Sequence, residues 1–292
     1  MAGKCFVAKI ARDRWAGSLI IAVVNSLLAK LKSDALLTRV LRNSGFLFSS
    51  TFVSAALGFV QGILVVRLLG IEKFGALTAV MLFASNVNRL LSFRMSEVTV
   101  KYLGEALAQE NKARAAALAK WIGIAEAFTS ILAYLVLFFL SAWFAGDVAL
   151  TGYYRFYGLF LLANLVYETS TGILQATDRF KRVAFANLLQ SVLTFLLIGL
   201  AFFMHWSMFE ILVAYLVGKT LAALVVTVSA VGELTRKLGA GWARASFGLI
   251  PDWKSIIRFA VSTNVNGTVN LFARDNIPLY IKYFVSDTAL GY

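Results

Sequence analysis

Residues 43–66 read NSGFLFSSTFVSAALGFVQGILVV and contain no charged side chain over 24 positions. A helix needs ~20 apolar residues to cross a hydrocarbon core ~30 Å thick. Two later stretches are similar: Ala127–Gly146 has 20 residues and Val183–Met204 has 22, again without a charge. Three such stretches predict a chain that crosses a membrane several times as helices.

Composition supports the same class. The chain has 292 residues, of which 60% are hydrophobic and 15% are charged, whereas soluble domains average ~45–50% and ~25%. Only 2 prolines occur, and no ten-residue alternation of a membrane barrel is present. We therefore predict an all-α polytopic membrane protein. One cysteine and one histidine leave no internal disulfide and no plausible metal cluster, so we expect no cofactor.

The net charge of +13 is explained by basic loops, and we expect no nucleic-acid partner. Four further apolar stretches carry isolated charges, at about 75–97, 153–177, 208–232 and 257–284, which makes seven predicted spans. Twenty Lys and Arg residues fall in the tail before residue 43 and in the loops after the second, fourth and sixth spans. Only two or three Lys or Arg residues lie in the loops on the other side of the membrane, after the first, third and fifth spans. This bias predicts a cytoplasmic N-terminus.

The segment Trp15–Ala29 is apolar but only 15 residues long. The basic residues that precede this segment resemble the start of a signal peptide. However, Lys30 and Lys32 come directly after the segment, and no small-residue cleavage site follows. An interfacial helix and an eighth crossing both remain open.

A weak internal repeat appears when the chain is shifted by 216 residues, which places Arg42 on Arg258 and Gly75 on Gly291. A repeat of this kind is typical of transporters built from two equivalent lobes. The stretches RLLGIEKFGALTAV, FRMSEVTVKYLGEA, RFAVSTNVNG and FVSDTALGY occur in the order and spacing of lipid-linked oligosaccharide flippases. Over about 42–292 the chain resembles this family, whose superfamily includes MATE antiporters and lipid II flippases.

The resemblance implies two six-helix lobes around a cavity that opens alternately to either side of a bacterial inner membrane. It predicts four segments: a basic N-terminal extension at 1–42, a six-helix lobe at 43–232, an inter-lobe loop at 233–256, and the first helix of a second lobe at 257–292. The rest of that second lobe is then a missing C-terminal partner.

Charged residues inside the spans are the candidate site. Arg89 lies ~21 Å below the outer end of a helix over 75–97, and Asn86, Arg89, Glu97 and Arg94 share an arc of about 140° on that helix. An intramembrane charge is costly in lipid and should face protein or water. The alternative is that Arg94 and Glu97 pair and only stabilise the lobe.

A second polar stripe runs along one face of the last predicted span. It consists of Thr263, Asn266, Asn270 and Arg274, which recur at helical spacing. Lys219 lies near the middle of the sixth span. The candidate substrate-binding residues are Arg89, Arg94, Lys219, Asn266, Asn270 and Arg274. The candidate coupling-ion residues are Glu126, Glu168 and Asp275.

The resemblance and the buried cations together favour a flippase for polyprenyl-diphosphate-linked oligosaccharides, with no bond broken. Guanidinium groups can bind a diphosphate, and Asn and Thr can meet sugar hydroxyls. A cation-coupled small-molecule antiporter of the same fold is the first alternative, kept open by Glu126 and Glu168. A membrane glycosyltransferase or polymerase is a weaker one, because acidic catalytic pairs are missing and the outer loops are short.

The Lys/Arg asymmetry yields a topology prediction. Reporter domains fused after Gly146 and after His205 should both lie outside the cytoplasm, because those loops carry few basic residues. A fusion after Arg182 should lie inside and serves as the control. A cytoplasmic signal from either outer fusion would contradict the seven-span arrangement.

Overall fold

The computed structural model describes residues 35–250 and 253–270, and side chains are described for residues 44–250 and 253–269. The chain divides into two compact units, residues 1–48 and 49–292. The described part of the first unit, residues 35–48, is helical. All contacts discussed below belong to the second unit.

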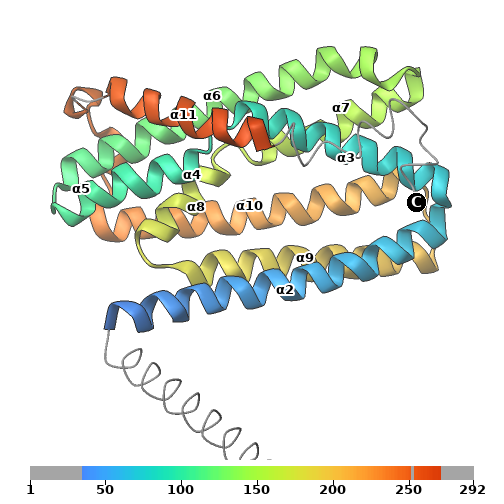
Figure 1. Cartoon of the computed structure of the whole chain (residues 1–292), viewed down its shortest axis with the longest axis horizontal. Coiled ribbons are helices and arrows are strands. Elements are labelled where there is room, and N and C mark those ends of the chain that lie inside the picture. The colour runs from blue at the N-terminus through green and yellow to red at the C-terminus, as the bar shows by residue number, and fades with distance from the viewer. Residues whose placement is uncertain (1–34, 251–252, 271–292) are drawn as a thin grey trace, which may run out of the picture. The chain divides into compact units, whose positions relative to one another are not determined.

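Every regular element in the described ranges is helical (Figure 1). The α-helices are α2 (Ala35–Leu69), α3 (Ile71–Leu91), α4 (Met95–Val98), α5 (Gly104–Ala108), α6 (Lys112–Ala145), α7 (Val148–Ala163), α8 (Tyr167–Ala176), α9 (Phe180–Phe203), α10 (Met208–Leu238) and α11 (Trp253–Asn270). A π-helical turn, η1 (Thr99–Leu103), joins α4 to α5. The 3-10 turns η2 (Trp242–Arg244) and η3 (Phe247–Leu249) follow α10.

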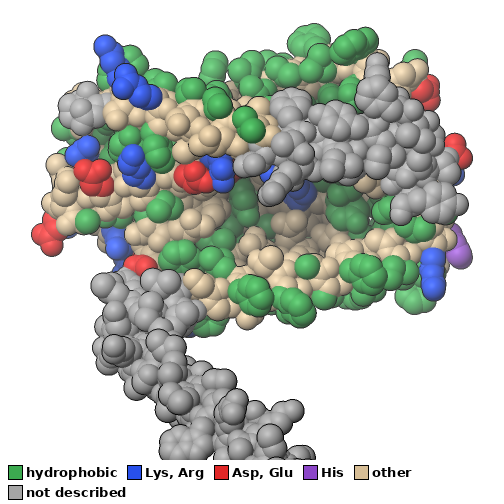
Figure 2. Space-filling view, viewed as in Figure 1, with side chains coloured by type: hydrophobic (Ala, Val, Ile, Leu, Met, Phe, Trp, Pro, Cys, Tyr) green, Lys and Arg blue, Asp and Glu red, His purple; other side chains and the backbone are tan. Residues whose placement is uncertain are grey.

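Within the described residues, five helical stretches are long and apolar enough to cross a membrane. They are Ser44–Leu69, Ile71–Ala108, Lys112–Ala145, Phe180–Phe203 and Met208–Leu238. Hydrophobic side chains are exposed along the helices (Figure 2), as expected of surfaces that meet lipid. The predicted all-α polytopic membrane fold is confirmed.

Several predicted boundaries differ from the structure. The span predicted over 75–97 is not continuous, because α3 ends at Leu91 and a new helix begins at Met95. The span predicted over 153–177 is likewise divided into α7 and α8. Part of the loop predicted before Ala127 is instead the first turns of α6. Trp15–Ala29 and the end of the seventh predicted span lie outside the described residues.

A buried hydrophobic cluster lies mainly among α3, α6, α7, α9 and α10. The Phe83 ring stacks on Phe144 at a centroid distance of 4.6 Å and meets Tyr154 edge-on at 5.2 Å. Leu137 and Ile198 are fully buried in the same cluster. This cluster anchors α3 and α7 up to the points where each helix is interrupted.

Residues 49–69 of α2 pack only sparsely on the other helices. Phe52 and Phe59 are 68% and 73% exposed. Contact is maintained by the buried Val65 and by a hydrogen bond of 3.0 Å from Gln61 Nε2 to the Ser191 carbonyl oxygen of α9. The exposed phenylalanines are suited to a lipid environment.

One buried carboxylate ties α10 to the start of α9. Glu233, only 1% exposed, accepts a hydrogen bond from Arg179 Nε at 3.2 Å, and its Oε2 lies 4.0 Å from Arg182. Arg236, one turn further along α10, donates to the same carboxylate. Three guanidinium groups from two helix ends thus share one anion.

The two interrupted regions pack closely because Gly172 of α8 has no side chain. A Cβ at this position would lie 2.6 Å from Thr99 Cβ and 2.8 Å from the Ser96 carbonyl oxygen. Both distances are shorter than real Cβ contacts. Gly172 therefore allows α8 to approach α4 and η1 to backbone contact.

We expect Gly172→Ala to destabilise the protein by about 1–3 kcal/mol, the usual effect of overfilling a packed contact. Gly199→Ala in α9 is the matched control, because a Cβ there meets nothing within 4 Å. Thermal unfolding of both purified variants in detergent measures the difference. Equal midpoints for the two variants would show that the close approach of α8 is not required.

Candidate functional site

The candidate site lies where two interrupted helices meet. The first interruption, between α3 and α4, contains two non-glycine residues in the left-handed region, Phe93 with φ 51° and Arg94 with φ 49°. This conformation costs an L-residue roughly 1–2 kcal/mol. The second interruption lies at residues 164–166, between α7 and α8. Because α4 packs against α8, the two interruptions are neighbours.

The start of α8 is capped by a carboxylate from another helix. Glu126 of α6, 2% exposed, accepts hydrogen bonds from the backbone N–H groups of Glu168 and Thr169, both at 2.7 Å. These N–H groups lie in the first helical turn and have no partner within α8. Glu126 therefore supplies the cap that the local sequence lacks.

The end of α3 is completed by α11. Asn264 donates a hydrogen bond of 2.8 Å from Nδ2 to the carbonyl oxygen of Leu90, one of the last carbonyl groups of α3. Asn264 lies on the buried face of α11 together with Ile256 and Ala260. Asn266, one of the predicted substrate-binding residues, is exposed on α11. The spacing 256, 260, 264 and 267 would have identified the packed face.

A polar pocket of about 370 Å³ opens at these interruptions. It is lined by Arg89, Ser92, Arg94, Ser96, Glu168 and Gly267.

Four helices, α3, α4, α8 and α11, contribute to the walls. Arg89 comes from the last turn of α3, Arg94 and Ser96 come from the start of α4, and Glu168 comes from the first turn of α8. Gly267 of α11 completes the lining, and a Cβ there would lie 3.4 Å from the Arg94 side chain. Thus Arg89, Arg94 and Glu168 of the predicted site residues line one pocket.

The pocket lining contains two guanidinium groups and one carboxylate, that of Glu168. Arg94 pairs with Glu97 at 2.5 Å, yet its side chain stays 45% exposed. Glu168 is turned toward the backbone N–H groups of Met95 and Ser96 at the start of α4. The Arg94–Glu97 pair, the alternative reading of these charges, is present, and the same arginine still lines the pocket.

The other predicted residues lie elsewhere. Lys219 lines a separate, mostly apolar cavity of about 370 Å³ between α2, α3, α7 and α10, with its ammonium group 4.6 Å from the centre of the Phe160 ring. Asn270 is the last residue of α11. Arg274 and Asp275 lie outside the described residues. Ser92 and Ser96, which sequence analysis did not select, flank Arg94 two residues away on either side.

In the described part of the chain, no group of three or more His, Cys, Asp or Glu side chains could hold a metal ion.

Comparison with known protein families gives a match. The family model described as "Polysaccharide biosynthesis protein" matches residues 40–292. No curated protein and no solved structure matches the chain.

We expect Glu126→Ala to destabilise the fold by about 3 kcal/mol, because two backbone N–H groups at a buried helix end lose their hydrogen-bond acceptor. Glu126→Gln should recover part of this loss, since the amide oxygen can still accept from one of them. Glu105→Ala is the control, because that carboxylate is exposed and bonds only to Gln109 among the described residues. The midpoints of thermal unfolding in detergent rank the three variants by stability. A Glu126→Ala variant as stable as Glu105→Ala would rule out the capping role.

Proposed function

Since this chain belongs to the polysaccharide biosynthesis protein family, we propose that it moves a polyprenyl-diphosphate-linked oligosaccharide across a bacterial inner membrane. The substrate passes from the cytoplasmic to the outer leaflet, and no covalent bond is made or broken. The N-terminus lies in the cytoplasm. The lipid tail of such a substrate can remain in the bilayer, whereas its diphosphate and sugars need a polar path.

The observation that supports this proposal best is the pocket that contains Arg89 and Arg94. A guanidinium group donates two parallel hydrogen bonds to a phosphate, and such charge-assisted bonds are roughly twice as strong as neutral ones. Two guanidinium groups at one pocket fit the two phosphates of a diphosphate. The hydroxyl groups of Ser92 and Ser96 offer partners for sugar hydroxyls.

The electrical potential across the membrane favours one direction of substrate movement. With the inside negative, outward movement of an anion is favoured by ~2.3 kcal/mol per charge per 100 mV. Asn266, Asn270 and Arg274 remain sequence-based candidates for contact with the substrate. Lys219 provides a further cation in its own cavity.

A cation-coupled antiporter remains the second candidate, and Glu168 is the residue that favours it. Of the two candidate carboxylates whose contacts are described, Glu126 caps α8. Glu168 lines the pocket, where it also faces backbone N–H groups at the start of α4. In the flippase scheme, Glu168 is the position at which a coupling cation competes with the guanidinium groups.

We expect Arg89→Ala and Arg94→Ala each to reduce translocation of a labelled lipid-linked oligosaccharide at least about tenfold, as a lost charge-assisted contact worth about 1.5–3 kcal/mol implies. Arg94→Lys should recover only part, because ammonium keeps the charge and loses the two-pronged geometry. The measurement uses the protein as the cell makes it, reconstituted into vesicles, with unfolding midpoints recorded alongside.

Arg67→Ala is the control for general loss of positive charge, since Arg67 is exposed at the end of α2. Normal translocation by both pocket variants would overturn the proposal. If the pocket variants instead transport a small organic cation less well and leave the lipid-linked oligosaccharide unaffected, the antiporter is supported.

A further inference from the structure

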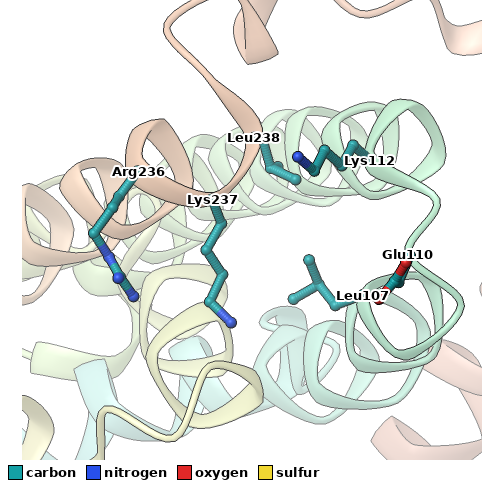
Figure 3. A pocket seen from close by; sticks show the side chains of 6 residues that line it. All are labelled: Leu107, Glu110, Lys112, Arg236, Lys237 and Leu238. Carbon is teal, nitrogen blue, oxygen red and sulfur yellow. The ribbon is translucent and has the colours of Figure 1, made fainter.

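A second charged pocket, separate from the one described above, lies at the end of three candidate spans. It has a volume of about 530 Å³ and is lined by Leu107, Glu110, Lys112, Arg236, Lys237 and Leu238. Figure 3 shows that these side chains come from two sides: α5, the α5–α6 turn and the first residue of α6 on one, and the last turn of α10 on the other.

The charges at this pocket are mainly positive. Lys112, Arg236 and Lys237 oppose a single carboxylate, Glu110. Arg236 is already bound to Glu233. The ammonium groups of Lys112 and Lys237 make no hydrogen bond or ion pair with another described residue, and the Lys237 side chain extends into the open space of the pocket (Figure 3).

The position of the pocket corresponds to a membrane surface. The candidate spans Ile71–Ala108 and Met208–Leu238 end beside it, and Lys112–Ala145 begins there. The Lys/Arg distribution predicts that this end faces the cytoplasm. Anionic phospholipids give a membrane surface a negative potential, which attracts nearby Lys and Arg side chains.

The lining also distinguishes between two sources of a phosphate group. Leu107 and Leu238 form apolar walls beside the two lysines. A free phosphate ion gains nothing from such walls. A phospholipid places its glycerol and the first carbons of its chains against them while its phosphate meets the ammonium groups.

We propose that this pocket binds the phosphoryl headgroup of an acidic phospholipid, held by Lys112 and Lys237. Occupancy joins the end of α10 to the start of α6 through one anion. The site shares no residue with the Arg89–Arg94 pocket, so the outcome of its test is independent of the translocation proposal.

The test titrates the detergent-purified full chain with phosphatidylglycerol or phosphatidylcholine and counts bound lipids by native mass spectrometry. Phosphatidylglycerol should bind the unmodified protein more tightly than phosphatidylcholine. The double variant Lys112→Gln with Lys237→Gln should bind phosphatidylglycerol roughly 30-fold more weakly, the effect of losing two contacts of ~1 kcal/mol. Lys112→Arg with Lys237→Arg should retain binding and shows that the charge itself is needed.

The matched control is Arg244→Gln with Lys254→Gln, which removes two exposed charges outside the pocket. It should change the affinity by less than about threefold, as expected for distant exposed charges. Equal loss in both double variants would overturn the proposal, as would equal binding of the two lipids. Displacement of phosphatidylglycerol by inorganic phosphate alone would assign the pocket to a free anion and overturn it too.

Discussion

In the apolar interior of a membrane, a backbone N–H or C=O group without a partner costs several kcal/mol, because no water is present to replace the lost hydrogen bond. This constraint governs the two interruptions on which the rest of the site depends. The first turn of α8 is completed by Glu126 of α6, and the last turn of α3 by Asn264 of α11. The polar pocket can exist because other helices supply what the interrupted helices lack.

The same constraint explains why some polar residues in the spans serve structure and others face the pocket. Glu126 and Asn264 are turned inward and bonded to backbone, whereas Arg89 and Arg94 are exposed. All four interrupt apolar sequence in a similar way. Only the contacts of each side chain separate a residue that supports the pocket from one that faces it.

Sequence reasoning predicted the membrane class, the all-helical fold and three of the residues that meet at the pocket. It placed Arg89 and Arg94 on one continuous helix, and that geometry is wrong because the chain turns at Phe93 with positive φ. No glycine or proline marks this turn. The cap on α8 could not be predicted from the sequence either, because Glu126 bonds to N–H groups of residues 42 and 43 positions later in the chain. Contacts between distant segments of this kind leave no local pattern.

The Glu233 cluster has a consequence for how the chain can vary. Three arginines depend on one carboxylate, so the arginines are partly redundant and the carboxylate is not. Replacing one arginine leaves two others to neutralise Glu233. Replacing Glu233 leaves three mutually repelling cations at the junction of α9 and α10. Among relatives, substitutions should therefore be more frequent at the three arginine positions than at the position of Glu233.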